Sequence, residues 1–181
     1  PAGGVTGLAF GPDGNLLASA TADGKLRLWS VRDGKVTREI AAHERGQTRV
    51  AISSDGRLLA TAGSDRMVRL WDAGSGKKLR ELEGHTRAVR SLSFGPKGKL
   101  VASAGRDGLV KLWDVKTGEA KMTLRSRANS VDRVEFSAEG DKLASGAANG
   151  SVHVWSVTDG KLLRTLHGHS GAVRAVSFSP D

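Results

Sequence analysis

The 181-residue chain contains no cysteine, which excludes disulfide bonds, thiol chemistry and metal sites built on cysteine ligands. It also lacks any apolar run approaching the roughly 20 residues that a membrane-spanning helix requires. The first ten residues, PAGGVTGLAF, combine neither a charged segment nor a long apolar stretch, unlike a signal peptide. We therefore expect a cytoplasmic protein with no membrane partner.

Aromatic residues are scarce as well, at 4% of the chain, whereas charged residues make up 26%. The 28 lysines and arginines exceed the 19 aspartates and glutamates, which gives a net charge of +9. Such an excess is compatible with nucleic acid or another acidic ligand as a partner. The basic residues, however, are spread along the whole chain and alternate with apolar ones, as on solvated strands that resist aggregation. Binding of nucleic acid is therefore the weaker alternative.

The few aromatic residues are placed periodically. All four tryptophans recur at an interval of 42 residues, which indicates one supersecondary unit copied along the chain. Three further columns keep the same interval, one apolar, one hydroxylic and one acidic. The columns are Trp29, Trp71, Trp113 and Trp155; Phe10, Ile52, Phe94, Phe136 and Phe178; Ser19, Thr61, Ser103 and Ser145; and Asp23, Asp65, Asp107 and Asn149.

The third repeat divides into four short strand-like runs separated by turns rich in glycine, proline, lysine and aspartate. These runs are Val89–Phe94, Leu100–Ala104, Val110–Trp113 and Ala120–Leu124. The same division predicts first strands near 5–10, 47–52, 131–136 and 173–178, and third strands near 25–29, 67–71 and 151–155. No segment has the periodicity of a helix. Four strands per repeat are typical of the blades of a β-propeller.

We therefore expect an all-β protein with four four-stranded antiparallel blades plus one extra strand, in a single, partial propeller domain over residues 1–181. A four-bladed arc would leave two blade faces bare, more apolar surface than a soluble monomer tolerates. The sequence thus favours a homodimer that closes an eight-bladed ring with twofold symmetry, or completion by another propeller fragment. The predicted blades span approximately 1–42, 43–84, 85–126 and 127–168, and the extra strand 169–181.

Short motifs identify the repeat more closely. A Gly-His pair occurs at 84–85 and 168–169, and a Trp-Asp pair follows at 71–72 and 113–114, with LAS or LAT and Asp-Gly between them. The chain resembles the WD40-repeat family over essentially its whole length. The resemblance implies a β-propeller that serves as a protein-interaction or assembly scaffold, with no enzymatic activity and no cofactor.

Histidine, serine or threonine, and aspartate recur together in two repeats, as in a catalytic triad. Here each set comes with a tryptophan at fixed spacing and is repeated, whereas an enzyme needs one exposed nucleophile. The resemblance implies instead a buried hydrogen-bond chain from the indole through the hydroxyl and the imidazole to the carboxylate. A buried indole N–H needs such an acceptor. The predicted structural tetrads are His43, Thr61, Asp65 and Trp71, and His85, Ser103, Asp107 and Trp113.

The other repeats carry partial tetrads. The fourth has Ser145, Asn149 and Trp155, with Arg127 where the histidine belongs, so we expect this blade to be the weakest. The first has Ser19, Asp23 and Trp29 but no histidine. Residues 169–181 are in register with residues 1–13, which leaves two alternatives. They replace the first strand and bring His169 to Ser19 or Asp23, or they begin a fifth, truncated blade.

The resemblance also places partner contacts five residues after the histidine and one residue before the aspartate. Two of these positions, Arg90 and Arg106, belong to one repeat and could bind an anion or a carboxylate together. None of them is aromatic, although aromatic anchors dominate most interfaces. A truncated or engineered fragment without a native partner therefore remains an alternative. The candidate positions are Thr6, Thr48, Ser64, Arg90, Arg106, Asp132 and Arg174, with Ala22 and Ala148.

Histidines 167 and 169 lie two residues apart, but no third ligand or carboxylate accompanies them, so we predict no metal site.

Overall fold

The computed structural model describes residues 3–44, 46 and 48–179. These residues form strands and turns but no helix, and hence no helix that could cross a membrane. The strands, in chain order, are β1 (Val5–Phe10), β2 (Leu16–Thr21), β3 (Lys25–Ser30), β4 (Lys35–Ala41), β5 (Arg49–Ile52), β6 (Leu58–Ala62), β7 (Val68–Asp72), β8 (Lys78–Leu82), β9 (Val89–Phe94), β10 (Leu100–Gly105), β11 (Leu109–Asp114), β12 (Ala120–Arg125), β13 (Val131–Phe136), β14 (Lys142–Ala147), β15 (Val152–Ser156) and β16 (Leu162–Leu166).

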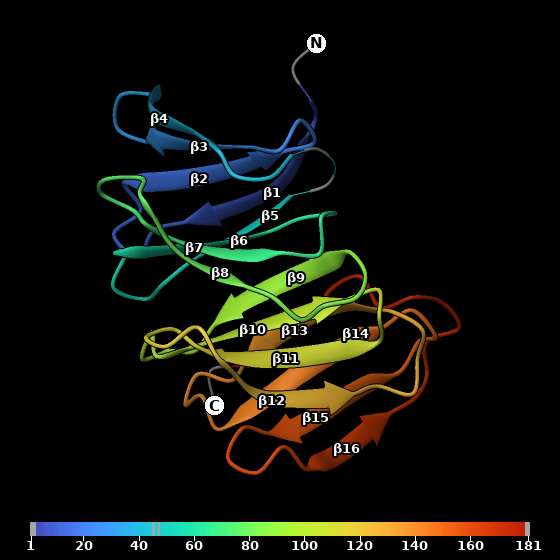
Figure 1. The fold of residues 1–181 in the computed structure, drawn as a ribbon. Coiled ribbons are helices and arrows are strands. Elements are labelled where there is room, and N and C mark those ends of the chain that lie inside the picture. Colours follow the sequence, from blue (N-terminus) through green and yellow to red (C-terminus); the bar gives the residue numbers. More distant parts are fainter. Residues whose placement is uncertain (1–2, 45, 47, 180–181) are drawn as a thin grey trace.

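Consecutive strands pair in antiparallel fashion to make four-stranded sheets, here called blades one to four: β1–β4, β5–β8, β9–β12 and β13–β16. The blades stack one after another, from the blue blade one to the orange and red blade four (Figure 1). Their first strands contact one another along the inner side, β1 with β5, β5 with β9, and β9 with β13. The sheets do not close into a ring, and blades one and four lie at opposite ends of the arc (Figure 1).

The blades are held together by apolar layers between them. The second strand of each blade carries small residues, such as Ala102, Ser103 and Ala104 in β10, and in the two interior blades neighbouring blades cover it on both faces. Between blades two and three, Trp113 packs with Val68, Leu70 and other side chains. Equivalent clusters join blade one to two and blade three to four. Each fully buried large side chain stabilises the stack by about 1.5–3 kcal/mol.

The turn between the second and third strands needs a left-handed residue in every blade. Three blades place glycine there, with φ of 84° at Gly24, 75° at Gly108 and 85° at Gly150. Glycine reaches this region without a steric penalty. Blade two has Arg66 at the same position, with φ of 73°. This arginine therefore holds a strained backbone within an otherwise regular repeat.

Residues 171–179 depart from the expected pattern, because they form no strand. They nevertheless lie against blade four: the Val173 amide donates to the Ala147 carbonyl oxygen at 3.1 Å, as the Val89 amide does to Gly63 at 3.3 Å. The segment thus occupies the place of the inner strand of a further blade. The prediction of a strand over 173–178 is wrong, because no described segment pairs with these residues in a ladder. The strand expected over 47–52 is also shorter, since β5 begins at Arg49 and residue 47 lies outside the described residues.

Candidate functional site

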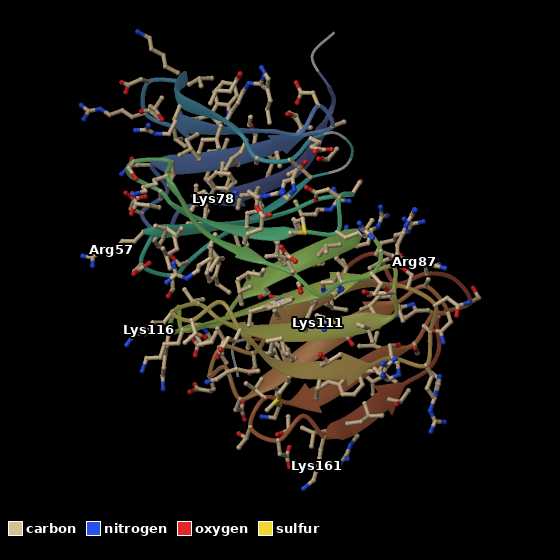
Figure 2. The ribbon with its side chains drawn as sticks, viewed as in Figure 1. Arg57, Lys78, Arg87, Lys111, Lys116 and Lys161 are labelled. Atoms are coloured by element: carbon tan, nitrogen blue, oxygen red, sulfur yellow. The ribbon has the colours of Figure 1, made fainter. Side chains whose placement is uncertain are left out.

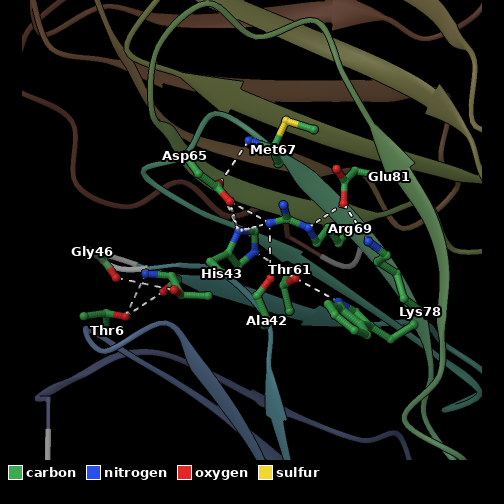
Figure 3. A network of polar contacts seen from close by, with 12 residues as sticks. Thr6, Ala42, His43, Gly46, Thr61, Asp65, Met67, Arg69, Lys78 and Glu81 are labelled. Carbon is green, nitrogen blue, oxygen red and sulfur yellow. Dashed lines mark hydrogen bonds and ion pairs between the residues drawn. The ribbon is translucent and has the colours of Figure 1, made fainter.

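In blade two the four tetrad side chains form a continuous hydrogen-bond chain (Figure 3). The Trp71 indole N–H donates to Thr61 Oγ1 at 2.9 Å, and Thr61 Oγ1 lies 3.0 Å from His43 Nε2. His43 Nδ1 lies 2.9 Å from the nearer Asp65 carboxylate oxygen. Arg69 Nη1 donates to the other carboxylate oxygen at 2.6 Å and is the last donor of this hydrogen-bond network. The predicted tetrad therefore exists as a connected network.

The chain fixes the tautomer of His43. The Asp65 carboxylate can only accept, so its hydrogen bond with His43 requires the ring proton on Nδ1, although Arg69 Nη1, itself a donor, also lies 2.6 Å from Nδ1. Nε2 then accepts from the Thr61 hydroxyl, which accepts in turn from the Trp71 indole. Burial lowers the pKa of His43 despite the opposing effect of Asp65, so the imidazole is neutral. For Asp65, burial acts to raise the pKa, but hydrogen bonds from Arg69 and His43 outweigh it and lower the pKa.

Blade three repeats this chain. The Trp113 indole donates to Ser103 Oγ at 2.7 Å, Ser103 Oγ lies 2.8 Å from His85 Nε2, and His85 Nδ1 lies 2.8 Å from Asp107 Oδ2. The same carboxylate accepts the Thr86 amide at 2.9 Å, so it also fixes the loop that carries the histidine. Burial lowers the pKa of His85 in the same way. The hydroxyl is fully buried behind the tryptophan, which leaves no exposed nucleophile in this set.

Blades one and four keep only the indole–hydroxyl pair, at 2.8 Å in each. In blade one the Thr21 hydroxyl donates to Asp23 and takes the place of an imidazole. In blade four Asn149 Oδ1 accepts from the Ser151 hydroxyl at 2.7 Å, while Arg127 is exposed and does not replace the histidine. The two partial tetrads are therefore shorter, as their residues predicted.

A glycine at the end of the second strand or directly after it leaves room for the imidazole in blades two and three, and the sequence analysis missed it. A Cβ at Gly63 would lie 2.5 Å from His43 Nδ1, and one at Gly105 would lie 2.9 Å from His85 Nδ1. The same column holds Thr21 in blade one and Ala147 in blade four, the blades without a histidine. The 42-residue column of Thr, Gly, Gly and Ala was the signal that could have revealed this.

His169 does not complete the tetrad of blade one. It lies at the turn of blade four, where a Cβ on Gly150 would come within 2.3 Å of its carbonyl oxygen, and β1 itself pairs with β2. Within the single chain, residues 169–179 therefore do not replace the first strand of blade one, whereas their docking onto blade one of a neighbouring chain stays a prediction. Thr21 gives a physical reason, because its side chain fills the space that an imidazole needs.

The residues expected to contact a partner differ widely in exposure. Ser64, Arg106, Ala148 and Arg174 are exposed, whereas Thr48 is fully buried and Asp132 is only 8% exposed. The expectation of exposed contacts is therefore wrong for the last two. They lie where the inner strands of neighbouring blades converge. The Thr48 amide donates to Thr6 Oγ1 at 3.2 Å, and Asp132 accepts from Ser130 at 2.9 Å.

Arg90 is engaged in this inner network rather than paired with Arg106. Its Nε lies 3.6 Å from Asp132 Oδ1, and its carbonyl oxygen accepts from Arg49 Nε at 3.0 Å. Arg49 also donates to the carbonyl oxygen of Thr6. These bonds join the inner strands of blades one, two and three. The structure therefore gives Arg90 a role between blades, and its anion-binding pair with Arg106 stays a prediction.

Positive charge does not gather on one face. The labelled side chains Arg57, Lys78, Arg87, Lys111, Lys116 and Lys161 project in different directions from blades two, three and four (Figure 2). Several lysines and arginines pair with acids of the same blade, as Arg69 does with Glu81 at 2.7 Å and Arg27 with Glu39 at 2.8 Å. Among the described residues, no cluster of three histidine, aspartate or glutamate side chains could hold a metal ion.

Blade one ends in a bare face, and blade four is bare at its outer strand, where residues 171–179 do not cover it. On blade one, Leu8 is 60% exposed and Phe10 63%, whereas the equivalent Val50 in blade two is 9% exposed. At the other end, Leu166 is 52% exposed, whereas its equivalents Leu82 and Leu124 are buried. In the interior blades the neighbouring blade covers these positions. The end faces are thus unpartnered copies of surfaces that pack elsewhere in the same molecule.

The fold and the repeated tryptophan-anchored chain define a propeller-blade repeat protein. The family model WD40, described as WD domain, G-beta repeat, matches residues 1–30, 34–72, 76–114, 118–156 and 160–181. The chain therefore belongs to the WD40-repeat family. No curated protein matches it. WD40 repeats generally mediate interactions between proteins, and the proteins that carry them are typically scaffolds without enzymatic activity.

The matched repeats are offset from the blades. The second match, residues 34–72, begins before β4 of blade one and ends with β7 of blade two. Each sequence repeat therefore joins the outer strand of one blade to three strands of the next. Five matches accompany four sheets because the first contains β1–β3 and the last contains β16 and residues 171–179.

Proposed function

We propose that this protein is an assembly scaffold whose open arc is completed by the blades of another polypeptide, in the first place a second copy of itself. Two arcs of four blades would then form an eight-bladed ring. The observation that supports this proposal is the bare apolar face of blade one, together with the exposed outer strand at the other end of the arc. Soluble monomers rarely expose contiguous patches of this kind.

The end faces are complementary because the blades are copies of one unit. In the interior, Val50, Leu59 and Trp71 of blade two pack against Ala18, Leu26 and Leu28 of blade one. The equivalent residues on the free face of blade one are Leu8, Leu17 and Trp29. On the free face of blade four, the equivalents of the Ala18 set are Ala144, Val152 and Val154. The free face of blade one in one copy therefore matches the free face of blade four in another.

In a dimer with twofold symmetry, blade one of each copy would pack on blade four of the other, and no end face would stay free. The segment 171–179 lies against blade four where β1 of the second copy would come. Val173 and Val176 both lie within contact distance of a Cβ placed on Gly146. Ring closure therefore requires this segment to move away from blade four, and the two arrangements compete.

Light scattering at micromolar concentration tests the proposal directly. We expect the mass of two chains for the unaltered protein. The double variant Leu8→Glu/Phe10→Glu places two charges on the free face of blade one and should give the mass of one chain. Its fold should survive, because both side chains are more than half exposed in the single arc.

Leu79→Glu is the matched control, since Leu79 is 39% exposed on β8, the outer strand of an interior blade. This variant should keep the mass of two chains. A single-chain mass for the unaltered protein would contradict self-assembly and leave a different propeller fragment as the partner. A partner that binds through the end faces should then be lost in the Leu8→Glu/Phe10→Glu variant and kept in the control.

A further inference from the structure

A pocket of about 610 Å³ lies in the groove between blades three and four. Blade three contributes Arg125 and Arg127, from the end of β12 and the loop that follows it. Blade four contributes Trp155 and Leu162 as apolar walls, together with polar side chains of β15, β16 and their loops. The volume is within the range of about 300–1,000 Å³ that is usual for small-molecule sites.

The equivalent groove between blades one and two offers a comparison. There the pocket is smaller, about 400 Å³, and His43 and Arg69 line it. Its basic groups are matched by acids of the same chain: Arg69 pairs with Asp65 at 2.6 Å, and Lys78 pairs with Glu81 at 2.9 Å. In the groove between blades one and two, Arg69 and Lys78 are therefore each paired with an acidic side chain of the same protein.

Between blades three and four both acids are replaced. The position of Asp65 holds Asn149, and the position of Glu81 holds Thr165. No aspartate or glutamate lines the pocket, while two arginines and two histidines do. Within the described part of the chain, no ion pair involves Arg125, Arg127, His153 or His167. The pocket therefore keeps basic groups and lacks their counter-charges.

His153 adds a buried titratable group to this set. It is only 5% exposed, its ring centroid lies 5.5 Å from that of Trp155, and its Nδ1 has no hydrogen-bond partner among the described residues. Burial and the nearby His167 both lower the pKa of His153. Asn149 uses its oxygen to accept from Ser151, which leaves its NH₂ group as a donor. A buried polar atom without a partner is costly unless a ligand or water satisfies it.

We propose that this pocket binds a small organic phosphate. Arg125 and Arg127 bind the phosphate oxygens, because a guanidinium presents a planar set of donors that matches them. The Asn149 NH₂ group and the two imidazoles add further donors. Trp155 and Leu162 contact the organic part of the ligand. The site lies in the groove between blades, away from the bare end faces, and does not depend on ring closure.

Calorimetric titration with phenyl phosphate tests the proposal, and inorganic phosphate serves as the second probe. We expect one site per chain and tighter binding of phenyl phosphate, since only this probe contacts the apolar walls. The double variant Arg125→Gln/Arg127→Gln should weaken binding by at least about tenfold. The control Arg80→Gln/Arg164→Gln removes the same charge from two outer strands, at residues that do not line the pocket, and should bind nearly as tightly as the unaltered protein. Equal losses in the two double variants would show a general charge effect and overturn the proposal.

A second variant tests the site without removing any of its basic groups. Asn149→Asp restores the acid that blades one to three carry, at a position that is exposed and should tolerate it. We expect it to weaken phenyl phosphate binding by about tenfold through charge repulsion while the melting temperature stays near that of the unaltered protein. Undiminished binding in this variant would contradict the proposal, whatever the arginine variants do.

The pH dependence of sulfate binding tests the imidazoles, because sulfate keeps both charges over the range in which histidine titrates. We expect sulfate to bind more tightly as the pH falls from about 8 to about 5.5, as His153 gains a proton beside Arg125 and Arg127. Burial lowers the pKa of His153, so the gain comes at the acidic end of this range. His153→Gln should flatten this dependence and leave binding at the higher pH nearly unchanged. A pH-independent affinity in the unaltered protein would contradict the part assigned to His153 in this site.

Discussion

At the scale of single residues, the tryptophans of blades two and three pack in the core, and their burial makes a hydrogen-bond acceptor necessary for each indole N–H. The indole N–H of each tryptophan is buried and must find an acceptor. The hydroxyl supplies it, but its own proton then needs the imidazole, and the imidazole needs the carboxylate. Each member is thus satisfied only through the next. Loss of any one leaves a buried polar group unpaired.

We therefore expect His85→Ala and Asp107→Ala to lower the free energy of unfolding by about 1–3 kcal/mol each. His85 is 6% exposed and bridges Ser103 and Asp107, so its removal leaves both without their partner. Thermal unfolding measures the effect. His169→Ala removes an exposed histidine and serves as the control, with a melting temperature close to that of the unaltered protein. An unchanged melting temperature in the Asp107 variant would contradict the role assigned to the chain.

The buried imidazoles also predict how stability depends on pH. The pKa values of His43 and His85 are lowered in the folded state, chiefly by burial. Between the folded and unfolded pKa values the unfolded chain binds more protons, so stability rises with pH in that interval. We expect the melting temperature to fall as the pH drops below about 6.5, the usual histidine value. His85→Gln should make this dependence shallower; an equal slope in both proteins would show that the imidazole is not the group responsible.

Much of this residue-scale chemistry could be predicted from the sequence, because the tetrad is encoded by fixed spacings. Trp71, Thr61 and Asp65 fall in columns that repeat in blade three. The hydrogen-bond chain that they form lies within one blade and the loop that precedes it. The burial of Thr48 and Asp132 could not be predicted in this way. It depends on how the inner strands of neighbouring blades converge, which no spacing within one repeat reports.

At the scale of strands and turns, the same contrast appears between local and non-local determinants. Alternating apolar residues and Gly-rich turns predict strands such as β9 and β12 nearly to the residue. Residues 173–178 carry the same alternation but form no strand. Alternation specifies which side chains can be buried, whereas a strand also requires a hydrogen-bonded neighbour. The segment packs against blade four, but no neighbouring strand forms a ladder of backbone hydrogen bonds with it.

The docked segment 171–179 can be released by one substitution. Val173 is 5% exposed, and its amide donates to Ala147, so Val173→Asp places a charge against blade four. In the monomeric Leu8→Glu/Phe10→Glu background we expect a loss of about 1.5–3 kcal/mol in the free energy of unfolding, the burial energy of the valine. In the otherwise unaltered chain the dimer should become tighter, because the competing segment leaves the face where β1 of the second copy docks. Ser179→Asp, directly after Phe178 and exposed, should do neither. A weaker dimer in the Val173 variant would show that the segment assists closure.

At the scale of the whole molecule, the arc behaves as a short stack in which each blade contacts only its neighbours. Stability in such repeats is approximately the sum of the blades and the interfaces between them. Blades two and three have two neighbours and complete tetrads. Blades one and four each have one neighbour and an incomplete tetrad. The missing neighbour and the incomplete tetrad both favour earlier unfolding of the end blades. Ring closure would supply the missing neighbour but would leave the tetrads incomplete.

Amide hydrogen exchange can therefore read out assembly and blade stability in one experiment. In the Leu8→Glu/Phe10→Glu variant we expect amides of β2, β3, β14 and β15 to exchange faster than those of β6, β7, β10 and β11, at any protein concentration. In the unaltered protein the end blades should gain protection as the concentration rises, because each then acquires the neighbour that it lacks in the single arc. The interior blades should change little, since they have both neighbours in either state. Protection that is uniform over the four blades and independent of concentration would mean that the arc opens as one unit and that no second copy covers its ends.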